Sequence, residues 1–186
     1  GSADDLLARD YSRYLFKTGR FEQAAQALGR YLGAAGSGFQ QSTWILNGGF
    51  EDRLLGTDFD WRIDSMKGAL SGIDPAVSHS GSHSVRVRFD GTGNMDFQHI
   101  RQLLFLPAGN YRLSAWIKTD GITTDQGVGL LLTGVDNGPP LRAATERLSG
   151  TNGWKKLEAT FQVPAGGKLA ALQLVRERSY RLVNQI

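Results

Sequence analysis

The sequence contains no cysteine among its 186 residues. This absence excludes a disulfide framework, thiol catalysis and a zinc site with cysteine ligands. It leaves the cellular compartment open, because a protein in an oxidising compartment can also lack cysteine. A chain of this length buries about 70% of the surface that its unfolded form exposes, so its core needs neither a disulfide nor a metal ion.

An excess of charge and a long apolar run are also missing. The 21 Lys and Arg residues nearly balance the 18 Asp and Glu residues. The resulting net charge of +3 gives no indication of nucleic-acid binding. No stretch approaches the roughly 20 apolar residues of a transmembrane helix. Gly1 and Ser2 are typical of residues left by cloning, so we expect that the natural N-terminus has been removed.

Apolar and polar residues alternate along most of the chain after residue 39. A period of two is typical of strands with one buried and one solvent-exposed face. Turn-forming residues separate these segments. The pattern predicts a mainly β fold, a two-sheet jelly-roll β-sandwich over residues 39–186. The expected inward residues are Val85, Val87, Phe89, Tyr111, Leu113, Ala115, Ile117, Leu157, Ala159, Phe161 and Val163, with Val128, Leu130, Leu132, Leu172 and Leu174 on further strands.

Residues 4–33 show the apolar spacing of two helices, separated at Gly19. Leu7, Tyr11 and Tyr14 fall on one face of the first helix, and Phe21 belongs to the apolar stripe of the second. We therefore expect residues 1–38 to form a short α-helical hairpin and a linker.

The segment from Tyr14 to Leu28 resembles the turn and second helix of a tetratricopeptide repeat. Gly19 matches the turn, and Ala24 matches the small residue where the helices cross. A single repeat cannot bury its own apolar face. The hairpin is therefore either the last unit of a helical array or a pair of helices that packs on the β domain. The resemblance implies protein partners for the helices.

Three segments, Asn47–Glu51, Val77–Phe89 and Leu106–Lys118, resemble in order and spacing the jelly-roll modules of the carbohydrate-binding type, within the galactose-binding-like group. Such modules bind ligands and seldom catalyse. With the helical hairpin, the arrangement resembles proteins of bacterial polysaccharide synthesis and export. The resemblance implies a non-enzymatic carbohydrate-recognition or assembly module in the periplasm or cell envelope. Two alternatives stay open: a protein–protein scaffold without sugar binding, and an ancillary domain of a polysaccharide-modifying enzyme.

The polar side of one expected strand is the first candidate site. It carries Arg112, Trp116 and Lys118, and another strand adds Arg86 and Arg88. An aromatic ring stacks on the apolar face of a sugar, and several arginines suit an acidic sugar through bidentate contacts. The alternative is that the helices or a loop cover Trp116, because tryptophan is buried on average.

A second candidate lies in two polar segments, residues 90–102 and 121–127. By their resemblance to the polysaccharide-export proteins, Asp96, His99, Gln102, Asp125 and Gln126 are candidate ligand-binding residues. The alternative is turn chemistry, because Asp and Asn side chains commonly bond to nearby backbone groups.

The resemblance also implies a structural calcium site in which Glu51 is a ligand. Related modules complete this site with backbone carbonyls, near the turn at Ser80 and Gly81 in this chain, and with an acid of a last strand. Calcium binds six to eight oxygens, and the matching last strand would begin only near Asn184. No cofactor is required otherwise.

Catalytic residues are not predicted. His79, His83 and His99 lack the spaced partners of a zinc site or a triad. Asp58 and Asp60 have no second acid set opposite them at a separation suited to glycoside hydrolysis. We therefore expect a protein that is not an enzyme.

Overall fold

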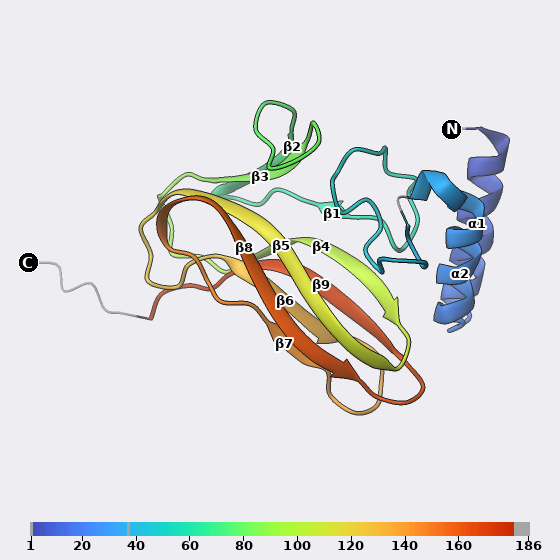
Figure 1. The fold of residues 1–186 in the computed structure, drawn as a ribbon. Helices are drawn as coiled ribbons and strands as arrows, with labels where there is room; N and C mark the ends of the chain where they lie inside the picture. Colours follow the sequence, from blue (N-terminus) through green and yellow to red (C-terminus); the bar gives the residue numbers. More distant parts are fainter. Residues whose placement is uncertain (1, 37, 181–186) are drawn as a thin grey trace, which may run out of the picture.

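Two helices precede a β domain in the computed structural model, which describes residues 2–36 and 38–180 (Figure 1). Helix α1 (Ala3–Lys17) begins with a capping box, in which the Ser2 hydroxyl accepts a hydrogen bond from the Asp5 amide at 3.1 Å and the Asp5 carboxylate accepts one from the Ser2 amide. The box satisfies two amides that the helix itself leaves without partners. Helix α2 (Phe21–Leu32) ends at Gly33, whose φ of +50° suits glycine.

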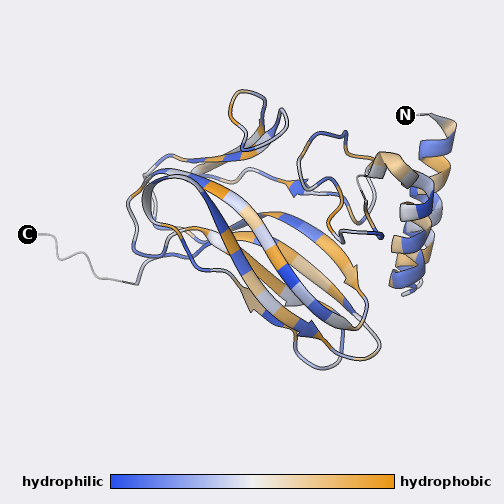
Figure 2. Ribbon diagram, viewed as in Figure 1, coloured by the Kyte–Doolittle hydropathy of each residue, from blue (hydrophilic) through white to orange (hydrophobic). Residues whose placement is uncertain are grey.

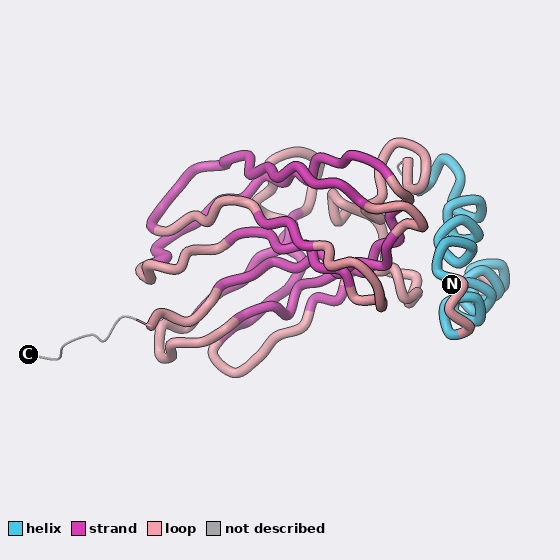
Figure 3. Tube along the Cα trace, turned by 90° about the horizontal axis from the view of Figure 1, so that it is seen from below, coloured by secondary structure: helices cyan, strands magenta, loops and turns pink. Residues whose placement is uncertain are grey.

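Antiparallel strands form two layers. One layer is a five-stranded sheet with the order β1-β4-β9-β6-β7, and the other consists of two separate pairs, β2-β3 and β5-β8. In the view from below, the strands form one block, and the helices lie beyond one end of it (Figure 3). The strands are β1 (Arg62–Ile63), β2 (Ala69–Asp74), β3 (Ser84–Phe89), β4 (Phe97–Leu106), β5 (Gly109–Ile122), β6 (Gly129–Gly134), β7 (Arg142–Ala144), β8 (Gly150–Val163) and β9 (Lys168–Arg176).

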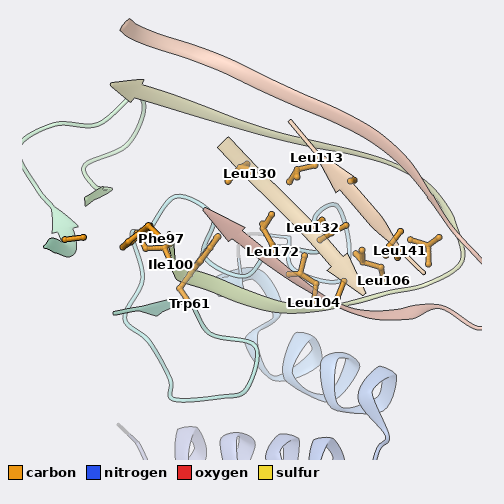
Figure 4. Close-up of a cluster of buried hydrophobic side chains, with 14 residues drawn as sticks. Trp61, Phe97, Ile100, Leu104, Leu106, Leu113, Leu130, Leu132, Leu141 and Leu172 are labelled. Atoms are coloured by element: carbon orange, nitrogen blue, oxygen red, sulfur yellow. The ribbon is translucent and has the colours of Figure 1, made fainter. Parts of the chain in front are cut away.

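The main core lies between the two layers. Leu113 of β5 meets Leu132 and Leu172 of the five-stranded sheet there (Figure 4). Along β5 and β8, apolar and polar residues alternate, as Figure 2 shows by colour. The predicted mainly β sandwich with an N-terminal helical hairpin is therefore confirmed. The predicted last strand near Asn184 lies outside the described residues.

The helices pack against one end of the five-stranded sheet, where β4 finishes and β9 begins. Strand β4 directs Leu104 into the main core and Phe105 to a second buried cluster, where it meets Leu28 of α2 and Phe59. Residues 33–36, expected as part of a linker, form the short 3-10 helix η1 (Gly33–Gly36). The hairpin thus packs on the β domain. Its likeness to a tetratricopeptide repeat, and its place at the end of a helical array, stay predictions. Neither described helix is long and apolar enough to cross a membrane.

The importance of the main core is testable by cavity formation. Leu172 is 2% exposed, and replacing it by alanine should lower the free energy of unfolding by about 2–5 kcal/mol. Leu70 is 68% exposed on β2, so Leu70→Ala is the matched control and should change stability by no more than about 0.5 kcal/mol. Urea denaturation followed by circular dichroism measures both. Equal effects of the two substitutions would contradict this placement of the core.

Candidate functional site

The outer face of β5 and β8 gathers polar and aromatic side chains. On β5, Arg112, Ser114, Trp116 and Lys118 are exposed, whereas the residues between them are buried or half-buried. Register pairs Trp116 with Lys156 and Ser114 with Glu158 of β8. The alternation predicted for this strand therefore brings Arg112, Trp116 and Lys118 onto one face.

Trp116 belongs to an aromatic group in which His79 contacts both other rings. The imidazole of His79 stacks on its ring with the centroids 3.9 Å apart and an interplanar angle of 11°. Trp154 of β8 meets the same imidazole edge-on at 5.7 Å. Trp116 remains 45% exposed. A loop residue therefore covers part of the indole, while the helices pack on the opposite layer.

His79 belongs to the loop between β2 and β3, which Glu51 holds in place. The Glu51 carboxylate accepts hydrogen bonds from the amides of Ser82 and His83 at 2.7 and 3.0 Å and contacts His83 Nδ1 at 2.7 Å. These interactions, led by the one with the His83 ring, hold the pKa of Glu51 below its usual range. Gly81 has a φ of +68°, and a side chain there would meet the Glu51 carboxylate. This turn thus requires glycine.

The surroundings of Glu51 bear on the expected calcium site. Two backbone amides point their hydrogens at its carboxylate, where calcium would need further oxygens. Among residues 2–36 and 38–180, no group of three or more His, Asp or Glu side chains is arranged to hold a metal ion. Among the described residues, the Glu51 carboxylate therefore secures a turn. Calcium binding stays a prediction.

Cations outnumber acids on this face. Lys156 pairs with Glu158 at 2.8 Å, and Arg112 lies 3.8 Å from the same carboxylate. On the β2-β3 pair, Arg86 and Arg88 are exposed on β3, and Arg86 binds the buried Asp74 at 3.1 Å. Glu158 is thus shared by two cations, and Lys118 and Arg88 are exposed as well. Asp120 is an exposed acid further along β5, so the cations on these strands still exceed the acids.

A large hollow opens beside these residues. Its volume is about 940 Å³, and its lining includes His79, Trp116, Lys118 and Trp154. The lining continues inward between β3 and β5 to apolar residues of the opposite sheet, such as Leu172. A concave site with an aromatic wall and a few polar groups is the usual form of a ligand site.

Two members of the second candidate set make contacts within the fold. Asp96 forms an ion pair with Arg178 at 2.6 Å and accepts a hydrogen bond from the Arg178 amide. Gln102 is 1% exposed and donates to the carbonyl of Leu46 at 2.8 Å. Both side chains therefore hold neighbouring backbone segments together.

The remaining members of that set lie on β4 and in the loop between β5 and β6. His99 is half-buried on β4, with its ring 5.5 Å from that of Phe97. Asp125 and Gln126 occupy the loop between β5 and β6, where Asp125 is exposed and Gln126 is half-buried. Their roles as ligand-binding residues stay predictions.

The carboxylates of Asp58 and Asp60 line a second, smaller hollow on another part of the surface. Asp60 is 5% exposed, and its carboxylate accepts a hydrogen bond from the Thr57 amide at 2.7 Å. Burial raises the pKa of Asp60. Its contact with Thr57 is that of a turn residue.

Sequence reasoning missed His79 and Trp154 as members of the site. His79 is thirty-seven positions before Trp116, and only the folding of the β2-β3 loop brings their rings together. Trp154 could have been found from the sequence. It lies two positions before Lys156, and alternate residues of a strand share one face.

The chain matches a known family of domains. A family model described as a carbohydrate binding domain matches residues 42–177, which is well over half of the chain. The search of curated proteins found no significant match.

The role of Glu51 predicts a pH-dependent stability difference. A carboxyl group with a lowered folded pKa contributes stability that is present above its unfolded pKa and is lost as the pH falls through the folded pKa. Glu51→Gln should therefore lower the melting temperature at about pH 5 and have much less effect at about pH 3. Asp52→Asn is the matched control and should show no such trend. An effect of Glu51→Gln that is the same at both pH values would contradict the assigned role.

Proposed function

The chain belongs to the family of carbohydrate-binding domains, and on that premise we propose that it recognises a glycan on the outer face of β5 and β8. The observation that carries the proposal is the part-exposed indole of Trp116, stacked on His79 beside cationic side chains. The part of the ring that stays exposed offers an apolar surface to the C–H groups of a sugar, and the stacked imidazole limits the movement of the ring. An anchor that is already ordered loses little conformational entropy when it binds.

We propose that the glycan is acidic. Arg112, Lys118 and Lys156 lie on the same outer face as Trp116, together with the acid Glu158, and a second acid, Asp120, is exposed further along β5. Arginine forms bidentate hydrogen bonds with carboxylate and sulfate-like groups. A neutral sugar would form no ion pairs with these cations, so they would contribute less to its binding. Since the cations are exposed, their attraction for an acidic polymer should weaken as salt is added.

We propose further that the protein is a non-enzymatic recognition or assembly module of bacterial polysaccharide synthesis or export, in the periplasm or cell envelope. This part of the proposal depends on the resemblance of the helical hairpin and β domain to such proteins. Binding through Trp116 requires no group that makes or breaks bonds. A role as the ancillary domain of a polysaccharide-modifying enzyme is compatible with the same binding face.

Affinity electrophoresis tests the glycan proposal directly. Native gels containing acidic or neutral polysaccharides, with and without calcium, should show retardation by at least one acidic polymer. Trp116→Ala should weaken binding about tenfold or more, because truncating a central aromatic anchor typically costs about 2 kcal/mol or more. Calcium-dependent retardation would support the expected calcium site.

The matched control is Tyr11→Ala, which removes an aromatic ring that is 55% exposed on α1. It should leave retardation unchanged, because α1 packs on the opposite layer. Absence of retardation by every polymer in the panel, or retardation that survives Trp116→Ala, would contradict the proposed binding face.

A second candidate function is protein contact through α1. Leu7, Tyr11 and Tyr14 are 71%, 55% and 57% exposed, and their spacing places them along one side of the helix. Such a row supports the alternative of a scaffold whose helices bind protein. If the row binds protein, the triple variant Leu7→Ser, Tyr11→Ser and Tyr14→Ser should lose partners in cross-linking experiments while polysaccharide retardation persists. Loss of both would contradict two separate surfaces.

A further inference from the structure

One side of helix α1 is exposed, while its other sides are covered. Ser12 donates a hydrogen bond to the Ala24 carbonyl of α2 at 3.2 Å. Arg13 donates one to the Gly56 carbonyl at 2.7 Å. The two helices lie at one end of the molecule, beyond the strands (Figure 1), so the exposed side of α1 is at the periphery.

The exposed side carries the apolar row of Leu7, Tyr11 and Tyr14. The steps of four and three residues between them are those of the positions that form the seam between two paired helices. A second helix that packs along this row removes its apolar surface from water, which favours association. The spacing therefore fits a helix as the occupant of this side.

The charge on the same side changes sign along α1. Asp4 is exposed in the first turn and Asp10 at the middle, whereas Lys17 is exposed in the last turn. Arg20, just beyond the helix, places its guanidinium 5.2 Å from the centre of the Tyr14 ring. Within residues 2–36 and 38–180, no ion pair involves Asp4, Lys17 or Arg20. These charges are therefore open to a partner whose charges run in the opposite order.

We propose that α1 pairs with α1 of a second copy of this chain, in antiparallel orientation, to form a symmetric dimer. The proposal rests on the second candidate function, protein contact through α1, and names the partner. A two-fold interface uses the same surface of both molecules, so that surface must complement itself. In the antiparallel orientation the acidic first turn of each helix lies towards the basic last turn of the other. A parallel pair would set like charges together, which is unfavourable.

The spacing of the charges also specifies the register of the pair. Asp10 and Lys17 are seven positions apart, so they lie on the same flank of the apolar row. The two-fold axis relates each flank to its own copy, so Asp10 can face the partner's Lys17. The axis then passes close to Tyr14, and the tyrosines of the two copies pack together. Asp10 already contacts Arg9 at 2.9 Å, but its side chain is 59% exposed and its carboxylate can accept further hydrogen bonds.

Analytical ultracentrifugation of the chain tests the dimer. The weight-average mass should rise from that of one chain towards that of two as the concentration increases from about 5 to about 500 µM. Tyr14→Ser should raise the dissociation constant of the dimer at least tenfold, because it removes a central aromatic anchor. Leu70→Ser on β2, where Leu70 is 68% exposed, is the matched control and should leave the dissociation constant unchanged. A mass that stays that of one chain throughout overturns the proposal.

Exchange of the two charges tests the antiparallel register. Asp10→Lys should raise the dissociation constant at least threefold, because it sets like charges against each other on both sides of the axis. Asp10→Lys combined with Lys17→Asp should restore dimerisation, because opposite charges then face each other again. Equal dissociation constants for the unchanged chain and Asp10→Lys, or no recovery in the double variant, overturn the register.

A single cysteine gives a second measure of the same contact. The chain has no other cysteine, so a disulfide can form only between two copies. Under mild oxidation, Tyr14→Cys should form a disulfide-linked dimer at least tenfold faster than Leu70→Cys does, because position 14 lies close to the proposed axis. Equal rates for the two variants overturn the proposed contact.

Two further outcomes separate this proposal from its neighbours. If the chain stays monomeric while α1 cross-links to a different protein, protein contact through α1 stands and a second copy is overturned as the occupant. Trp116→Ala should leave dimerisation unchanged, and Tyr14→Ser should leave polysaccharide retardation unchanged. Failure of the dimer and failure of the glycan proposal are therefore distinguishable.

Discussion

The packing of β5 and β8 across the five-stranded sheet is the contact on which the rest of the structure depends. Leu113 and Leu157 turn inward from these strands, and Leu157 is fully buried. Because successive side chains of a strand point to opposite faces, burying these residues directs Trp116, Arg112 and Lys156 outward. A shift of one residue in either strand would reverse both faces. The core and the proposed glycan face are thus two consequences of one register.

Local alternation explains why much of this could be predicted from the sequence. The inward set around Leu113 and the outward set around Trp116 follow from a period of two, which needs no knowledge of distant residues. The helical hairpin follows in the same way from apolar spacing and the break at Gly19. Gln102 shows the limit of such reasoning, because its hydrogen bond to the Leu46 carbonyl joins positions far apart in the chain. From the sequence alone, Gln102 was a candidate ligand-binding residue.

The parts of the site that prediction missed depend on loop geometry. His79 reaches Trp116 because Glu51 secures the turn around Gly81, and this turn is built from residues about thirty positions apart. The division of one layer between β3 and β5 depends on which strands pair, and alternation alone does not specify pairing.

The most direct test of the glycan face uses the four tryptophans of the chain as internal probes. In a ¹⁵N NMR spectrum, each indole N–H gives its own signal, and fragments of a polysaccharide that retards the protein can be titrated in. Trp116 and Trp154 should shift, whereas Trp61, which donates to the Asn47 carbonyl in the core, and Trp44, which packs against the core, should not. Shifts confined to Trp44 and Trp61 would contradict a binding site on the outer face of β5 and β8.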